Sequence, residues 1–192
     1  MKSKLALTIF VLCGATVAGW LIWRELSSVE NKNAPLPALE NPRLVVKKSR
    51  RKLFVYDGER LVKTYKLALG AQPAGDKETE GDGKTPEGDF YVAVKNPKSK
   101  FYLSLGLSYP NAEHARRGLR ERLISQAEHD EILKAIAEKR LPPQKTRLGG
   151  EIYLHGGGNE IDWTAGCAAF DDAQIAELFA VVPLQTLVTI EP

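Results

Sequence analysis

Cysteine is nearly absent from this chain: 2 of its 192 residues are cysteines, at positions 13 and 167. Cys13 lies inside an uncharged N-terminal run, which leaves Cys167 as the single thiol of the remaining sequence. A single thiol cannot form an internal disulfide, and spare thiols are unusual in exported proteins. The scarcity therefore favours a chemical role for Cys167 over a structural one.

A net charge is also missing from most of the chain. The sequence holds 27 basic and 24 acidic residues, and Lys2, Lys4 and Arg24 flank the apolar run. From residue 25 onward the balance is therefore 24 against 24. A protein that binds nucleic acid in general would show a basic excess, so this class is excluded.

One local basic cluster stands out, formed by Lys47, Lys48, Arg50, Arg51 and Lys52. We predict a solvated hairpin turn there, because short charge blocks usually face water. The alternative is contact with anionic envelope polymers or lipid head groups.

Two familiar catalytic patterns are missing as well. The chain has 3 histidines, and we expect His114 and His129 to be surface residues, without acids at the spacing of a zinc site. No metal is predicted. The string from His155 to Gly158 resembles a lipase oxyanion loop, but the chain lacks the Gly-x-Ser-x-Gly nucleophile turn, which excludes that class.

The N-terminus predicts the compartment. Residues 5–23 form an uncharged run that is long enough for a membrane-spanning helix. Residues 1–4, which include Lys2 and Lys4, predict a basic cytoplasmic tail. A cleaved signal peptide with its site near Ala18 is the alternative. Residues 24–42, rich in Asn and Pro, predict a linker, and residues 43–192 form one domain. We therefore expect an inner-membrane anchor with its domain on the periplasmic side.

The domain sequence predicts a mainly β fold. Val, Leu, Phe and Tyr recur in short runs with turn signals between them, and a polar loop covers 70–89. A capping box at Ser125 and Glu128 begins a helix in the insert 112–140, and Asp171 or Asp172 begins another. We expect an antiparallel β sandwich or barrel with helical insertions. The predicted strands are 43–48, 52–56, 60–69, 90–94, 101–107, 151–155 and 187–190, and the second helix is 172–179.

The candidate catalytic pair is Cys167 and His155, twelve positions apart. A thiol needs a nearby base to become a thiolate at neutral pH, and His155 at a strand end can supply it. We expect Gly156 to let backbone carbonyls orient the imidazole, with Asp162 as the alternative. We expect Gly166 to turn the backbone so that N–H groups near Cys167 face a developing oxyanion.

Four further residues are candidates for contact with substrate: Tyr153, Gly157, Trp163 and Thr164. They flank the catalytic pair in sequence. Trp163 has the alternative of core packing, which is the usual place of large aromatic side chains.

Three stretches resemble the L,D-transpeptidase catalytic domain, or YkuD-type domain, of bacterial cell-wall enzymes. That family carries a His-Gly pair, a spacer and Ser/Thr-His-Gly-Cys, with an upstream Thr-Pro-x-Gly-x-Phe loop. Here they are His155-Gly156, Thr164-Ala165-Gly166-Cys167 and the stretch from Thr85 to Phe90. The resemblance covers about residues 43–190.

The resemblance implies a reaction. Cys167 would attack the carbonyl of the third residue in a peptidoglycan stem tetrapeptide, and D-alanine would leave with help from His155. The thioester would pass to an amine or to water, in cell-wall remodelling or cross-linking that affects cell shape. The resemblance implies that no cofactor is needed. It also implies that carbapenems acylate Cys167.

Two departures leave the reaction open. Ala165 replaces the second histidine of the family, and Ala169 replaces an arginine two places after the cysteine. A murein amidase branch lacks that arginine and hydrolyses cell-wall bonds. We expect transfer, with hydrolysis by the same pair as the alternative. A membrane-anchored, non-catalytic wall-binding module is the alternative from another class.

Overall fold

The computed structural model describes residues 34–192, and residues 35–192 form one compact unit. The predicted tail 1–4, the predicted membrane helix 5–23 and most of the predicted linker lie outside the described residues. Within residues 34–192, no helix is both long and apolar enough to span a bilayer. The end of the predicted linker packs against the domain, because Leu36 is buried and its N–H donates to Glu177 Oε2 at 3.1 Å.

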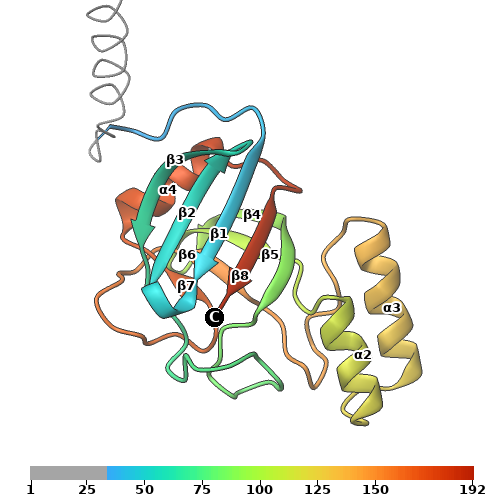
Figure 1. Cartoon of the computed structure of the whole chain (residues 1–192). Helices are drawn as coiled ribbons and strands as arrows, with labels where there is room; N and C mark the ends of the chain where they lie inside the picture. The colour runs from blue at the N-terminus through green and yellow to red at the C-terminus, as the bar shows by residue number, and fades with distance from the viewer. Residues whose placement is uncertain (1–33) are drawn as a thin grey trace, which may run out of the picture. The chain divides into compact units, whose positions relative to one another are not determined.

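Within the described range the strands form one curled sheet in the order β3-β2-β1-β8-β4-β5-β6-β7 (Figure 1). The bounds are β1 Pro42–Lys47, β2 Lys52–Asp57, β3 Arg60–Lys66, β4 Gly88–Ser99, β5 Tyr102–Leu107, β6 Tyr153–His155, β7 Ala168–Ala169 and β8 Leu187–Glu191. Most neighbours pair antiparallel, while β1 with β8 and β6 with β7 are parallel. The predicted mainly β class is confirmed.

The chain after β3 closes the curl of the sheet. Ala68 forms a bridge with Ala169 of β7, and Gly70 forms one with Thr164. These two bridges bring the start of the 70–89 loop against the segment that carries Cys167. The closure therefore places the region of the candidate catalytic pair at the last strands of the sheet.

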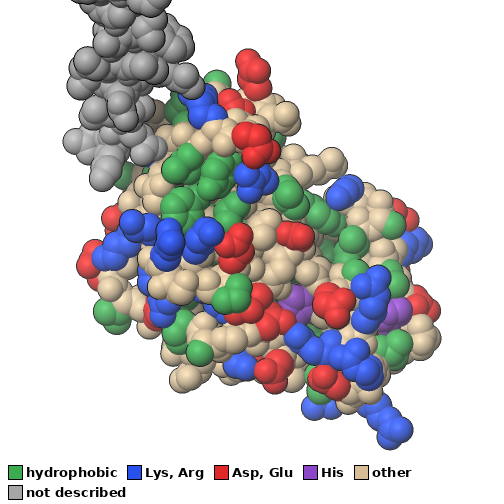
Figure 2. Space-filling view, in the orientation of Figure 1, with side chains coloured by type: hydrophobic (Ala, Val, Ile, Leu, Met, Phe, Trp, Pro, Cys, Tyr) green, Lys and Arg blue, Asp and Glu red, His purple; other side chains and the backbone are tan. Residues whose placement is uncertain are grey.

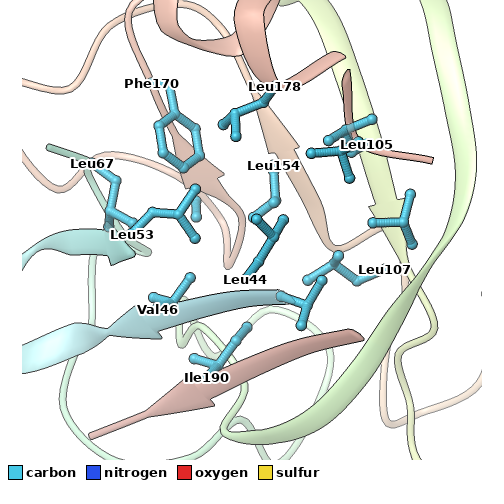
Figure 3. Close-up of a cluster of buried hydrophobic side chains, with 14 of the residues drawn as sticks. Leu44, Val46, Leu53, Leu67, Leu105, Leu107, Leu154, Phe170, Leu178 and Ile190 are labelled. Atoms are coloured by element: carbon cyan, nitrogen blue, oxygen red, sulfur yellow. The ribbon is translucent and has the colours of Figure 1, made fainter. Parts of the chain in front are cut away.

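The core lies inside the curl of the sheet and is covered by α4 (Asp172–Val181). Figure 3 shows side chains from β1, β2, β5, β6, β8 and α4 pointing toward one another, including Leu44, Leu53 and Leu178. These three are fully buried. Burial of each contributes about 1.5–3 kcal/mol relative to exposure. Alternation along the strands gives one apolar face, and that face forms the core.

The helical insert contains two helices, α2 (Ala112–Arg120) and α3 (Gln126–Ala137), which lie beyond β5 (Figure 1). The predicted capping box of Ser125 and Glu128 begins α3. Helix α2 was not predicted from the sequence, and its N-cap Asn111 accepts the N–H groups of Glu113 and His114. A separate small core of Ala115, Ile124, Ile132 and Leu148 holds the insert together.

His114 is not a surface residue, which corrects the prediction. Its side chain is buried, with Nε2 3.1 Å from Asp76 Oδ1 and Nδ1 2.6 Å from Asn111 Oδ1. Arg117 also donates to Asp76, at 2.6 Å. Burial acts to raise the pKa of Asp76, but His114 and Arg117 hold it well below its usual range. The 70–89 loop folds over α2 and supplies this carboxylate, a long-range contact that the sequence does not reveal.

The basic cluster forms the turn between β1 and β2, but it is not solvated throughout. Lys48 in the short 3-10 turn η1 (Lys48–Arg50) is 2 % exposed, and Arg51 pairs with Asp162 at 2.7 Å. The solvated-turn prediction is therefore wrong for these two side chains, since distant segments of the chain supply their partners. Elsewhere, basic and acidic side chains intersperse over the face seen in Figure 2, as the charge balance of the sequence predicts.

Candidate active site

A cleft of about 630 Å³ lies at the β5–β6–β7 side of the sheet. Its walls come from the β4–β5 hairpin, from the 150–155 segment that enters and forms β6, and from the 163–167 turn before β7. Lys77 and Glu80 of the 70–89 loop complete the lining. Both Cys167 and His155 line this cleft, so folding brings the predicted pair into one concave site.

Cys167 sits just before β7, and its sulfur lies against the approach to β6. The Tyr153 N–H donates to Sγ at 3.4 Å, and the thiol donates to the Glu151 carbonyl at 3.3 Å. The side chain is half-buried. These two backbone contacts fix the resting position of the thiol in the cleft.

The tight turn before Cys167 explains the residues that precede it. Thr164 Oγ1 donates to the Cys167 carbonyl at 2.8 Å and accepts the Gly166 N–H at 3.1 Å. Gly166 has φ +144°, and a Cβ there would lie 2.8 Å from the Lys84 carbonyl oxygen. Only glycine fits this position without strain. The Gly166 N–H is occupied by Thr164, which leaves the Cys167 N–H as the candidate oxyanion donor in this turn.

The Thr-Pro-x-Gly-x-Phe stretch supports this turn from behind. Thr85 is fully buried, accepts the Gly70 N–H at 2.9 Å and lies 3.4 Å from the Cys167 carbonyl oxygen, to which its hydroxyl donates. Lys48 in turn holds the Thr85 carbonyl at 2.9 Å and Glu87 Oε1 at 2.8 Å. A buried ammonium therefore anchors the loop that positions the cysteine turn.

His155 ends β6 and is 3 % exposed. Its Nδ1 lies 2.6 Å from the Gly156 carbonyl oxygen, which can only accept, so Nδ1 carries the proton. The other ring nitrogen, Nε2, is then the basic one. The Phe101 ring stacks on the imidazole, with 4.6 Å between the ring centres. The Trp163 ring meets the imidazole in a T-shaped arrangement, with 5.6 Å between the ring centres. The ring is thus oriented by one backbone carbonyl and two aromatic side chains.

Two glycines allow the chain to pass beneath the imidazole. A Cβ on Gly156 would lie 2.5 Å from Asp172 Oδ1, and the Gly157 N–H donates to the same oxygen at 2.9 Å. Neither glycine lines the cleft. Asp162 does not orient His155, because its carboxylate accepts from Arg51 and from the Leu69 N–H at 2.8 Å.

The candidate substrate contacts separate into two groups. Tyr153, Trp163 and Thr164 line the cleft, and Trp163 is 37 % exposed there rather than buried in the core. Gly157 lies behind the wall, where a Cβ would be 3.5 Å from the Trp163 ring.

Lining residues that the sequence did not predict include Lys77, Glu80, Lys100, Phe101 and Glu151. Phe101 was assigned only to a strand face, and its stacking on His155 depends on the pairing of β5 with β6. Glu151 has φ +54°, unusual for a residue with a side chain, but no sequence signal marks such a conformation.

The site at rest holds a neutral thiol and a neutral imidazole. Burial raises the pKa of Cys167 to about 11, and the Glu151 charge adds to this, although the Tyr153 N–H lowers it. Burial lowers the pKa of His155, and Lys100 lowers it further. These pKa directions leave both groups uncharged in the resting cleft at neutral pH.

These pKa directions predict how Cys167 reacts with iodoacetamide. In a Cys13→Ser chain, we expect the alkylation rate to rise about tenfold per pH unit from pH 7 toward the pKa of about 11, because only the thiolate reacts. The urea-denatured chain should level off near the free-thiol pKa of about 8.5. The measurement is the rate of adduct formation by mass spectrometry. A plateau below pH 8 in the folded chain would show a preformed thiolate and contradict this description.

Comparison with known proteins supports the assignment of the fold. The family model described as the L,D-transpeptidase catalytic domain (YkuD) matches residues 41–190. The YafK protein of Escherichia coli (strain K12) is 35% identical over 71 residues, which cover 34% of this chain and 28% of YafK.

Two solved structures share the fold. The helical cell shape determining protein Pgp2 (K307A mutant) from Campylobacter jejuni is 26% identical, with a TM-score of 0.54, over 86% of this chain and 52% of that one. Bd1075 from Bdellovibrio bacteriovorus is 23% identical, with a TM-score of 0.51, over 82% and 51% of the two chains. The present chain spans about half the length of these two structures. Since the family model matches most of the chain, this protein belongs to the L,D-transpeptidase catalytic domain (YkuD) family.

Proposed function

We propose that this protein is a peptidoglycan L,D-transpeptidase that works through a Cys167 acyl-enzyme on stem tetrapeptides. The observation that carries the proposal is the shared cleft of Cys167 and His155, with the imidazole tautomer fixed by the Gly156 carbonyl. A nucleophile beside an oriented base is the arrangement that acyl transfer needs.

The first half-reaction forms a thioester. His155 Nε2 accepts the Cys167 proton as sulfur attacks the carbonyl carbon of the third stem residue. The bond to the terminal D-alanine nitrogen then breaks, and the imidazolium returns its proton to that leaving amine. The Cys167 N–H is the proposed oxyanion donor, since the Gly166 N–H is held by Thr164.

The second half-reaction transfers the acyl group. An amine of another stem or a protein lysine attacks the thioester carbonyl, His155 accepts the amine proton, and the Cys167 thiolate leaves and is reprotonated. The substrate places the reaction in the bacterial cell envelope. The cytoplasmic tail and membrane anchor predicted over residues 1–23 belong to the same proposal.

Hydrolysis is the second candidate function, favoured by two alanines. Ala165 lines the cleft without a functional group, and Ala169 is fully buried opposite His155 and Ala68. The positions where the family carries a second histidine and an arginine therefore offer nothing to hold an acceptor, and water is the competing nucleophile.

Product analysis separates the two reactions. The full-length chain is incubated with disaccharide-tetrapeptide muropeptides, with and without an added D-amino acid, and the products are read by mass spectrometry beside Cys167→Ala. Cross-linked dimers or exchange of the terminal D-alanine are the results expected from transpeptidation. Loss of D-alanine without transfer would show hydrolysis in place of transpeptidation. Unchanged muropeptides would contradict both proposed reactions.

A further inference from the structure

Four charged side chains line the catalytic cleft: Lys77, Glu80, Lys100 and Glu151. A stem tetrapeptide brings carboxylates into this cleft, including that of its terminal D-alanine. Carboxylates require a cationic partner when they leave bulk water. The charges of these four side chains therefore decide where the substrate carboxylate can be held.

Three of the four are poor partners for a carboxylate. Glu80 and Glu151 carry the same charge as the substrate and repel it. Lys77 is buried, and its ammonium already donates to Asp82 Oδ1 at 2.7 Å and to the Thr79 carbonyl at 3.0 Å. Its charge is compensated and its donors are directed into the 70–89 loop.

Lys100 differs in each of these respects. It lies in the turn between β4 and β5, is exposed, and forms no ion pair with any residue from 34 to 192. Its Nζ lies 5.2 Å from the centre of the Phe101 ring, which supplies a cation–π contact. Phe101 itself stacks on His155. A free ammonium is thus held at the edge of the stack that carries the catalytic base.

We propose that Lys100 binds a carboxylate of the donor stem peptide and so determines specificity for unamidated donors. The inference rests on the proposed function and names the residue that recognises the substrate charge. The nearness of Lys100 to the reacting groups supports it, because its charge lowers the pKa of both Cys167 and His155.

Binding is tested in the full-length Cys167→Ala chain, where no turnover interferes. The ligands are the free tetrapeptide, the tetrapeptide amidated at its terminal D-alanine, and the tetrapeptide amidated at the third residue. Calorimetry gives Kd for each with Lys100, with Lys100→Gln and with Lys100→Arg. The matched control is Lys98→Gln, an exposed lysine of the same hairpin that does not line the cleft.

We expect Lys100→Gln to weaken binding of the free tetrapeptide about five- to tenfold, a modest loss because Lys100 is solvent-exposed. One amidated peptide should be insensitive to the substitution, and its identity shows which carboxylate Lys100 holds. Lys100→Arg should restore binding, Lys98→Gln should change nothing, and the effect should shrink as salt is added.

Two results would overturn the proposal, and they differ from each other. An equal effect of Lys100→Gln on all three peptides, whether a loss of affinity or no change, would show that Lys100 holds neither of the two carboxylates tested. Absence of binding by every peptide to the unsubstituted Lys100 chain would instead contradict the proposed function, and the specificity role with it.

Discussion

Replacement of Cys167 by alanine is expected to reduce turnover of stem tetrapeptides by on the order of 10⁴-fold or more, to the uncatalysed background. The thioester route needs the sulfur, and within residues 34–192 Cys167 is the free cysteine. The measurement is the release of D-alanine together with the mass of the enzyme after exposure to meropenem. The unsubstituted chain should gain one carbapenem mass, and the variant should gain none.

Folding is the control for this experiment. Among residues 34–192, the hydrogen-bond partners of the sulfur are the Tyr153 N–H and the Glu151 carbonyl, so its loss should leave the unfolding midpoint nearly unchanged. Cys13→Ser should retain full activity. Turnover that persists in a folded Cys167→Ala chain would contradict the acyl-enzyme mechanism.

The raised pKa of Cys167 changes how slow thiol labelling is interpreted. A thiol with a pKa of about 11 reacts slowly with a neutral reagent at pH 7 even in an active enzyme. We expect a carbapenem to occupy the cleft as a substrate would, so formation of the carbapenem adduct is the more decisive observation.

Replacement of Lys48 by methionine is expected to lower the free energy of unfolding by about 3 kcal/mol. This value is at the low end of the range for breaking a buried ion pair, because the Glu87 side chain is partly exposed. The substitution leaves Glu87 without its cation and removes the donor to the Gly75 and Thr85 carbonyls. Urea unfolding of the full-length chain provides the measurement. Activity should fall as well, because Thr85 supports the Cys167 turn.

The neighbouring Lys47→Met is the matched control for this prediction. Lys47 pairs with Glu191 at 2.9 Å, with both side chains partly open to solvent. A surface pair of this kind contributes about 0–1 kcal/mol. Similar destabilisation by the two substitutions would show that the contacts of Lys48 do not anchor the loop.

The local sequence predicted much of the secondary structure because those signals are short-range. Alternating apolar residues identified most of the strands, and the capping box identified α3. Helix α2 was missed because charged residues dominate its sequence. Its buried Ala115 packs in the separate small core of the insert, and its buried His114 lies against the rings of Phe90 and Tyr109 in the main core.

The sequence by itself determined the identity of the candidate nucleophile and base, since Cys167 and His155 are rare residue types set among glycines in a recognisable order. The tertiary structure alone decided their surroundings. Contacts between distant segments bring together the pairs Lys48 with the Thr85 carbonyl, Asp76 with His114 and Asp162 with Arg51. Folding likewise places Lys100 in the lining of the cleft. Partner choice among charged side chains depends on the closure of the curled sheet, and no short sequence pattern encodes that closure.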